Sequence, residues 1–440
     1  MIPWFVLLLA LVDPWRPAYH FAPEKNWMND PNGLLYADGE YHLFYQYNPF
    51  GNKWGHMSWG HAVSSDLFHW RHLPVALREE NGIMIFSGSA VTDGSRMVAI
   101  YTGHTKERQH QNLAFSEDRG RTWSKFSGNP VLDIGEKNFR DPKVIRYRDR
   151  WIMVVALPRE HKVRFYSSTD LKAWEHLSDF GPAGATDGIW ECPDLFELDG
   201  QWVLVVNLNP GGIAGGSGGQ YFVGNFDGKH FRAPNTNPLW IDYGRDLYAT
   251  VSFFGTPGRR VWMGWMSNWQ YAEQEPTTTW KTAQSLPREV SVRDGRILQT
   301  PAREIQKLRG KLVDDIAQFR GDAYEIQAIL APGASVALRV GTGEETVIGL
   351  RDGKLYVDRS RSGNVEFHPS FAGVHAAPVG HGKPVSVRAF VDRSSIEVFG
   401  EGGSITITDR IFPSSESLGV QVRGDVRDVR VWPLADTMKQ

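Results

Sequence analysis

The chain has 440 residues, enough for two or three domains, and its 48 basic and 50 acidic side chains nearly cancel. This balance argues against a nucleic-acid partner, and the single cysteine, Cys192, excludes an intrachain disulfide and a thiolate metal cluster. Aromatic residues make up 12% of the chain, and 45 glycines and 25 prolines are spread along it, which is typical of an all-β protein with short strands and tight turns.

Residues 1–12 are almost wholly apolar, but this segment is too short to span a bilayer as a helix. It resembles the apolar region of a secretory signal, although no positive charge precedes it and no Ala-x-Ala cleavage site follows it. We interpret residues 1–18 as a clipped signal segment, with a buried lead-in strand as the alternative. Export to the periplasm or the medium is therefore expected, with a cytoplasmic location as the alternative.

Residues 27–33 (WMNDPNG) place one carboxylate, Asp30, between an amide and a proline. Proline fixes φ and removes a backbone donor, and Asn-Gly is a strong turn former. We therefore expect Asp30 at a rigid strand end that enters a turn. Taken alone, such an acid caps a loop more often than it performs chemistry. A chemical role is favoured because similar acid-bearing segments recur along the chain.

A first repeat consists of polar turns that end in an aromatic residue. The closing aromatics are 53, 51 and 57 residues apart along the series Trp70, Trp123, Trp174 and Phe231. The copy at residues 116–123 resembles the Asp-box hairpin of sialidase-like propellers, in which the acid bonds to the turn backbone. The pattern predicts a structural role for these acids and no chemistry.

A second series of strand starts alternates with these turns. Its members follow one another at intervals of 50 to 57 residues: Asp30, Phe86, Asp141, Glu191 and Tyr248. Five units of this length, each of about four short strands, predict a five-bladed β-propeller over residues 19–300. The innermost strands of a propeller converge on a central funnel. Asp30, Asp141 and Glu191 are therefore expected to meet despite their separation in sequence.

The pattern changes after about residue 301. Residues 301–312 (PAREIQKLRGKL) indicate a short amphipathic helical linker. Alternating strands then return without the blade signature, and residues 385–391 and 396–399 form a clear hairpin pattern. Residues 405–408, 418–422 and 426–432 indicate further strands. We predict a C-terminal antiparallel β-sandwich over residues 313–440.

Three acids that face one funnel, without a metal or nucleophilic triad motif, indicate glycosyl transfer. One carboxylate attacks or stabilises the oxocarbenium-like centre and a second protonates the leaving oxygen. Neighbouring negative charge and partial burial raise the pKa of such an acid. Arg140 adjoins Asp141 and favours its ionised form. This reasoning assigns the acid role to Glu191 and a permanent negative charge to Asp30 and Asp141.

Several motifs in order resemble glycoside hydrolase family 32, the β-fructosidases that include invertases, levanases, inulinases and sucrose-6-phosphate hydrolases. The resemblance begins near residue 19 and covers nearly the whole chain. It is carried by residues 27–33, QYNP (46–49), WGHMSWGH (54–61), FSGS (86–89), RDP (140–142), ECPD (191–194), GWMSNW (264–269) and VDRSSIEVF (391–399).

The resemblance implies a role for each matching residue. Asp30 matches the nucleophile, Glu191 the acid/base and Asp141 the stabiliser of the transition state. It further implies polar contacts to the terminal fructosyl unit from Asn29, Gln46, Ser87 and Arg140, and aromatic walls from Trp27, Trp54, Phe86 and Trp265. Retention of configuration, with working carboxyls about 5–5.5 Å apart, follows from this assignment, and no cofactor or metal is needed.

Two nearby features are left open or rejected. Cys192 either tunes the acid/base or fills space, and Asp194 either holds Arg140 or caps a turn. The glycine-rich residues 209–219 lack the Gly-Lys-Ser/Thr ending of a phosphate loop and no helix pattern follows them, so nucleotide binding is rejected.

Residues 248–252 and 265–271 are more similar to the levanase and exo-inulinase branch. This similarity implies an exo-acting hydrolase that releases fructose from levan, inulin or sucrose. A sucrose-specific invertase or a fructosyltransferase is the alternative enzyme. A catalytically silent fructan-binding propeller is less favoured, because pure binding would not need all three acids together with Arg140. Neither the oligomeric state nor the preferred fructan follows from the sequence.

Overall fold

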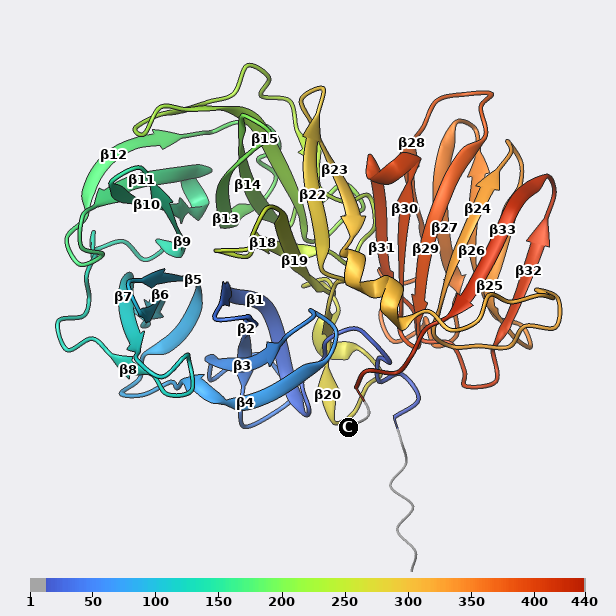
Figure 1. Cartoon of the computed structure of the whole chain (residues 1–440), viewed down its shortest axis with the longest axis horizontal. Coiled ribbons are helices and arrows are strands. Elements are labelled where there is room, and N and C mark those ends of the chain that lie inside the picture. Colours follow the sequence, from blue (N-terminus) through green and yellow to red (C-terminus); the bar gives the residue numbers. More distant parts are fainter. Residues whose placement is uncertain (1–12, 439–440) are drawn as a thin grey trace, which may run out of the picture.

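The computed structural model describes residues 13–438, and the apolar residues 1–12 lie outside this range. Five small sheets surround a common centre, and a two-sheet domain packs beside them (Figure 1). This arrangement confirms the predicted β-propeller followed by a β-sandwich. None of the helices in the described part of the chain is long and apolar enough to cross a membrane.

The five propeller sheets follow chain order, and each begins with its innermost strand (Figure 1). The first three sheets contain β1 (Asn26–Ala37), β2 (Glu40–Asn48), β3 (Ser58–Ser64) and β4 (Trp70–Leu77), then β5 (Met84–Asp93), β6 (Arg96–His104), β7 (Gln109–Ser116) and β8 (Ser124–Lys125), then β9 (Arg140–Tyr147), β10 (Arg150–Leu157), β11 (Lys162–Ser168) and β12 (Glu175–Phe180).

The fourth sheet contains β13 (Ile189–Leu198), β14 (Gln201–Asn209), β15 (Gly218–Phe226), β16 (Phe231–Arg232) and β17 (Leu239–Trp240). The fifth contains β18 (Tyr248–Ser252), β19 (Arg260–Met266), β21 (Ala283–Gln284), β22 (Arg288–Arg293) and β23 (Arg296–Pro301). Between β19 and β22 the chain also supplies β20 (Trp280–Lys281), which pairs in parallel with β1 and so joins the last blade to the first.

The polar turns of the first repeat connect the two outer strands of the first four blades. Asp66 accepts the backbone N–H groups of Phe68 and His69, and Asp170 binds its own turn in the same way. The indole of Trp70 donates to the carbonyl oxygen three residues earlier, as do the indoles of Trp123 and Trp174. The predicted structural role of these turns is confirmed.

Short 3₁₀ helices account for the helical structure of residues 13–438: η1 (Pro158–Glu160), η2 (Ala272–Gln274), η3 (Arg303–Leu308) and η4 (Glu401–Gly403). The linker predicted at residues 301–312 contains η3, whose Ile305 and Leu308 are buried. One side of this short segment therefore packs against the core, as the amphipathic pattern indicates.

The C-terminal domain consists of two five-stranded antiparallel sheets whose inner faces share one apolar core. One sheet contains β24 (Tyr324–Leu330), β29 (Val385–Asp392), β30 (Ser395–Gly400), β31 (Ile405–Arg410) and β33 (Val426–Pro433). The other contains β25 (Ser335–Val340), β26 (Glu345–Arg351), β27 (Lys354–Arg361), β28 (Val374–Pro378) and β32 (Gly419–Arg423). The predicted hairpin corresponds to β29 and β30.

One local expectation was wrong. Asp30 does not end a strand, because β1 continues through residues 27–33 to Ala37. The turn-forming residues are absorbed by two register shifts against β2, between Met28 and Pro31 and between Asn32 and Leu35. Gly33 adopts a left-handed φ of 52° within this segment. The sequence signals for a turn therefore produce β-bulges inside a long strand.

Candidate active site

All five innermost strands carry an irregularity at the positions of the second repeat. The register shifts lie between Met28 and Pro31 in β1, Ile85 and Gly88 in β5, Glu191 and Asp194 in β13, and Tyr248 and Val251 in β18; β9 has one opposite Val155 of β10. A bulge bends its strand and redirects the side chains beside it. Equivalent bulges therefore point polar side chains from every blade toward the central funnel.

Backbone strain accompanies three of these bulges. Asp141, Cys192 and Ala249 adopt left-handed φ values of 65°, 44° and 52°. Non-glycine residues occupy this region at an energetic cost, and such residues cluster at functional sites. Three of the five bulged strand starts therefore have strained backbone in addition to their polar side chains.

These strand starts surround a cavity of about 210 Å³. All three predicted acids line it, and each comes from a different blade. The complete lining consists of Asn29, Asp30, Gln46, Trp54, Phe86, Ser87, Arg140, Asp141, Glu191, Asn209 and Trp269. The funnel predicted from the repeat thus brings residues more than 160 positions apart into one pocket.

Asp30 is held by one hydrogen bond from its own strand and one from the first strand of the next blade. Ser87 Oγ donates to its Oδ2 at 2.6 Å, and the amide nitrogen of Asn29 donates to its Oδ1 at 3.1 Å. Burial raises the pKa of Asp30, whereas the hydrogen bonds from Ser87 and Asn29 lower it and the charge of Glu191 raises it again. The carboxylate is therefore fixed in orientation but poorly solvated, as suits a nucleophile.

Cys192 lies between the two aspartates. Its Sγ is 3.5 Å from Oδ2 of Asp30 and 3.6 Å from Oδ2 of Asp141, and its backbone N–H donates to the same Asp141 oxygen at 2.9 Å. Burial raises the pKa of the thiol well above its usual range, and the charges of Asp141 and Asp30 add to this effect. A neutral thiol thus lies between two carboxyl groups whose negative charges disfavour each other.

Glu191 is bound on both oxygens. Arg140 Nη2 is 3.0 Å from Oε1, and the hydroxyl of Tyr248 donates to Oε2 at 2.5 Å. Burial and the negative charge of Glu191 raise the pKa of Tyr248 well above its usual range, so the phenol stays protonated and acts as the donor. Tyr248 was used in the sequence argument as a strand start and as part of residues 248–252, and its contact with the acid was not anticipated.

Arg140 lies near two of the acids. Arg140 lies 4.0 Å from Asp141 but 3.0 Å from Glu191, so its guanidinium is directed to the acid of the next blade. Burial raises the pKa of Asp141 to about 7, because Arg140 only partly offsets it and the charge of Glu191 adds to it. Burial therefore opposes the ionised form of Asp141, which the charge of Arg140 favours.

The predicted polar residues Asn29, Gln46, Ser87 and Arg140 all line the pocket, as do the aromatic residues Trp54 and Phe86. Trp27 and Trp265 do not line it, because both are completely buried. They pack against Trp269, whose ring is stacked on Trp27 and lies 4.8 Å from that of Trp265. The lining residue Trp269 was missed, although it ends the same GWMSNW motif; Asn209 was missed as well.

Asp194 matches neither of its two expected roles. It is completely buried, pairs with Lys143 Nζ at 3.1 Å and accepts the backbone N–H of Ser252. It thus joins three blades next to the site. The glycine-rich residues 209–219 pack against Asn268, whose amide donates to the carbonyl oxygens of Gly215 and Ser217.

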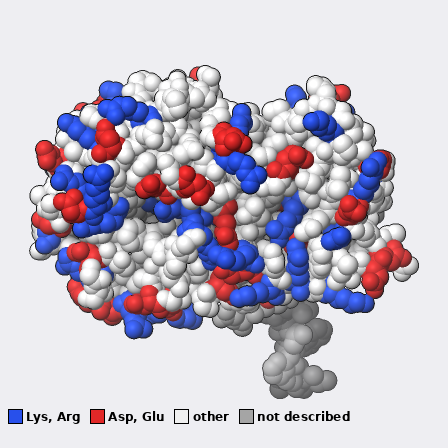
Figure 2. Space-filling model, turned by 45° about the horizontal axis from the view of Figure 1, so that its top comes forward, with Lys and Arg blue, Asp and Glu red and all other residues white. Residues whose placement is uncertain are grey.

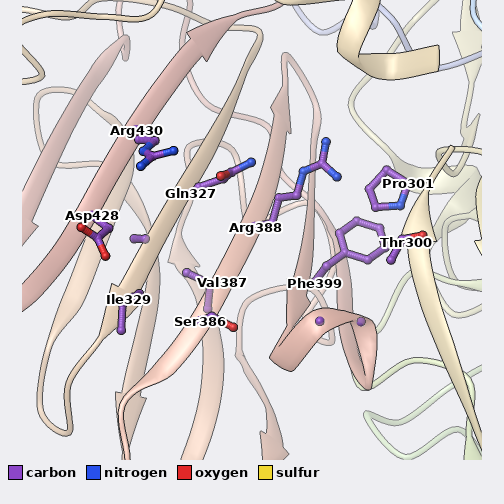
Figure 3. Close-up of a pocket in the computed structure, with 13 residues that line it drawn as sticks. Thr300, Pro301, Gln327, Ile329, Ser386, Val387, Arg388, Phe399, Asp428 and Arg430 are labelled. Carbon is purple, nitrogen blue, oxygen red and sulfur yellow. The ribbon is translucent and has the colours of Figure 1, made fainter. Parts of the chain in front are cut away.

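A second cavity, of about 340 Å³, lies between β23 and the sandwich (Figure 3). Asp428 is the only acid among its lining residues, so it offers no carboxylate pair. The described residues contain no cluster of three or more potential metal ligands. Acidic and basic side chains are mixed on the face in Figure 2, with no large area of one sign. The funnel is therefore the candidate active site.

Comparison with known proteins agrees with this architecture. The model for the glycosyl hydrolases family 32 N-terminal domain matches residues 20–301, and the model for the C-terminal domain matches residues 296–433. The levanase of Bacillus subtilis (strain 168) is 48% identical, with 93% of this chain and 68% of that protein covered. The extracellular exo-inulinase of Aspergillus awamori is 36% identical, with 96% of this chain and 95% of that protein covered. A crystal structure of exo-inulinase from the same organism superposes with a TM-score of 0.90, covering 96% of this chain and 99% of that chain.

Proposed function

Because the chain belongs to glycosyl hydrolases family 32, it is a glycoside hydrolase that acts on β-fructosides of the fructan and sucrose type, and we propose that it removes terminal β-D-fructofuranosyl units with retention of configuration. The observation that carries the mechanistic proposal is the meeting of Asp30, Asp141 and Glu191 in one small pocket. Two carboxyl groups, one ionised and one protonated, are what retaining hydrolysis requires.

In the first step, a carboxylate oxygen of Asp30 attacks the anomeric carbon of the fructosyl unit. The bond to the leaving sugar breaks, and Glu191 donates its proton to the departing oxygen. In the second step, Glu191 takes a proton from water, the water oxygen bonds to the anomeric carbon and the ester to Asp30 breaks. Asp141 binds the fructose hydroxyls throughout, and its position 2.9 Å from the backbone nitrogen of Cys192 fixes its orientation.

The size of the pocket supports attack at a chain end. A volume of about 210 Å³ is below the usual range of about 300–1,000 Å³ for sites that enclose drug-sized ligands. Trp54 and Phe86 line it, with ring centroids 6.0 Å apart, and Trp269 lines it as well. Such a pocket fits one sugar unit better than the interior of a polymer, because a polymer needs a groove open at both ends.

Export from the cytoplasm is also proposed, and it is supported by similarity to relatives described as extracellular. Of residues 1–18, where a signal or lead-in segment was expected, residues 1–12 lie outside the described residues, and Ala18 is buried and donates its backbone N–H to Asp392.

Chromatography of the products from levan, inulin, sucrose and sucrose-6-phosphate tests the reaction. Free fructose as the first product is expected, whereas oligofructans released early would contradict exo-action. Proton NMR of the newly released anomer tests retention. Asp30→Asn is expected to lose turnover while keeping sugar affinity; a variant that still turns over at the native rate would contradict the assigned nucleophile. Longer fructosyl products from sucrose would instead favour a fructosyltransferase.

A further inference from the structure

Two arginines of the sandwich domain reach into the propeller on the side of the active site. Arg359 extends from β27 and Arg410 from the end of β31, and both are completely buried. Arg359 pairs with Asp246, and Arg410 Nη2 lies 3.1 Å from Oε2 of Glu275. Both acids belong to the fifth blade, so two buried ion pairs cross the domain boundary at this end.

Asp246 is two residues before Tyr248, the residue that donates to Glu191. One oxygen of Asp246 accepts the hydroxyl of Tyr271, and the other pairs with Arg359 and accepts the backbone N–H of Arg410 at 2.7 Å. Arg359 Nη2 also donates to the hydroxyl of Tyr271 at 2.9 Å. Arg359 therefore closes a network that fixes the start of β18.

The second ion pair acts on the turn between β19 and β20. Glu275 accepts the hydroxyl of Ser267 at 2.7 Å, so this carboxylate joins the two ends of residues 267–275. That turn carries Trp269, which lines the pocket, and Tyr271 lies two residues later. Arg410 and Arg359 thus hold the turn at Glu275 and Tyr271, on the C-terminal side of Trp269.

A buried ion pair is weak evidence for a contribution to stability. Burying two charges costs solvation energy that their attraction only partly repays, and apolar replacements of buried pairs are often as stable or more so. What a buried pair adds is a fixed geometry, because each charge must meet its partner. Here the fixed elements are those that bear Tyr248 and Trp269.

We propose that Arg359 and Arg410 are positioning residues through which the sandwich domain holds Tyr248 against Glu191 and Trp269 against the sugar. This inference rests on the proposed function, since it assigns a role relative to the acid/base. The groups that face Glu191 are Arg140 and Asp141 from β9, Tyr248 from β18, Asp30 from β1 and Cys192 from its own strand. Among these, Tyr248 is the one that the sandwich controls.

The test is the pH profile of kcat/KM for sucrose in Arg359→Lys and Tyr271→Phe. The basic limb of this profile reports the general acid, and loss of a hydrogen bond to an ionised carboxylate moves that limb to higher pH. Tyr248→Phe removes the bond itself and is the reference variant. We expect the basic limb of its kcat/KM profile to move to higher pH by about one unit. Arg359→Lys and Tyr271→Phe are expected to shift in the same direction by a smaller amount. Arg410→Lys is expected to raise KM several-fold with kcat nearly unchanged.

Arg288→Lys is the matched control. Arg288 is equally buried at the same domain boundary, where it pairs with Glu397 and Asp242, and none of its partners lines the pocket. Its thermal midpoint is expected to fall while its pH profile stays that of the wild type. Tyr271→Phe keeps the ring and removes one hydroxyl, so a folded variant is available even where Arg359→Lys does not fold.

An unshifted basic limb in both Arg359→Lys and Tyr271→Phe, or an equal shift in Arg288→Lys, would overturn the role of Arg359. An unchanged KM in Arg410→Lys would overturn the role of Arg410. Failure of the proposed function has a different signature, because Asp30→Asn would then retain full turnover. The two conclusions are therefore separable in one set of variants.

Discussion

The hydroxyl of Ser87 lies 2.6 Å from Oδ2 of Asp30, although the two residues are 57 positions apart. They occupy the bulges of the first strands in neighbouring blades. A charge-assisted bond of this length is about twice as strong as a neutral one. The blade repeat therefore supplies the nucleophile from one unit and its hydrogen-bond donor from the next.

Removal of this donor should change the pH dependence of the reaction. Burial raises the pKa of Asp30 and the bond from Ser87 lowers it, so Ser87→Ala should raise it further. A hydrogen bond to a charged group contributes about 1.5–3 kcal/mol, which corresponds to about one to two pH units. The acid limb of kcat/KM is expected to move to higher pH by this amount. Ser64→Ala, which removes a hydroxyl from an outer turn, is the control, and equal profiles in both variants would contradict the prediction.

The thiol of Cys192 should resist alkylation in the folded enzyme. Thiolates are the reactive species, and burial raises the pKa of this group well above its usual range. The side chain is also almost inaccessible. Because the chain has one cysteine, mass spectrometry after iodoacetamide treatment should show no adduct in buffer and one adduct in denaturant. Rapid modification without loss of structure would show that the site is more open than described.

The sequence was sufficient to predict that the three acids meet. The interval between strand starts predicts the number of blades, and equivalent positions on successive blades face one another. The sequence was insufficient to predict which carboxylate lies closest to Arg140. Adjacency in sequence favoured Asp141, but Glu191 from the next blade lies closer. Contacts between blades depend on how each bulge redirects its side chains, and residue type alone does not encode that direction.

The depth of the aromatic residues was equally hard to predict. Trp265 and Trp269 lie in one motif and Trp27 in another, yet of these three only Trp269 lines the cavity. The indole of Trp265 donates to Thr282 and that of Trp27 to Asn29, so both rings are fixed behind the lining. A motif indicates that a ring belongs to the region of the site, but its layer is decided by packing against neighbouring strands.

A buried histidine pair should make the propeller sensitive to acid. His42 Nδ1 lies 3.1 Å from His61 Nε2, and the ring of His61 is stacked on Phe44. Burial lowers the pKa of His42 to about 4 and that of His61 well below its usual range, and each ring's charge would disfavour charge on the other. Both rings are therefore neutral in the folded protein.

Stability from this pair is complete above about pH 6.5, the value in the unfolded chain, and falls as the pH drops toward 4, because the unfolded chain then binds more protons. The loss is about 1.4 kcal/mol per pH unit for each ring. His42→Gln is therefore expected to reduce the slope of the free energy of unfolding against pH in this window. The exposed His381→Gln should leave the slope unchanged. Identical slopes in His42→Gln and the wild type would refute the assignment.

Asp392 should be essential for stability but not for turnover. It accepts the backbone N–H groups of Ala18, Tyr19 and His20, and its Oδ2 lies 2.8 Å from Nδ1 of His20. The other ring nitrogen of His20 contacts Glu397 at 2.9 Å. Burial lowers the pKa of His20, but the bonds to Asp392 and Glu397 outweigh it and raise the pKa overall. The carboxylate thus ties the segment before the propeller to the sandwich.

Asp392→Ala leaves three buried donors and one side of an imidazole without a partner, so the free energy of unfolding should fall by about 3–5 kcal/mol. Denaturant titration measures this loss. Asp314→Ala, which removes an exposed acid, should change the free energy of unfolding by less than about 0.5 kcal/mol.

Because Asp392 contacts no residue of the pocket, kcat/KM of the folded Asp392→Ala variant at low temperature should equal that of the wild type. A variant that keeps its stability, or that folds fully but loses activity, would show that the domain boundary is organised differently. Equal activity with reduced stability would separate this end of the boundary from the end at Arg359, where the same kind of buried pair is expected to alter the reaction itself.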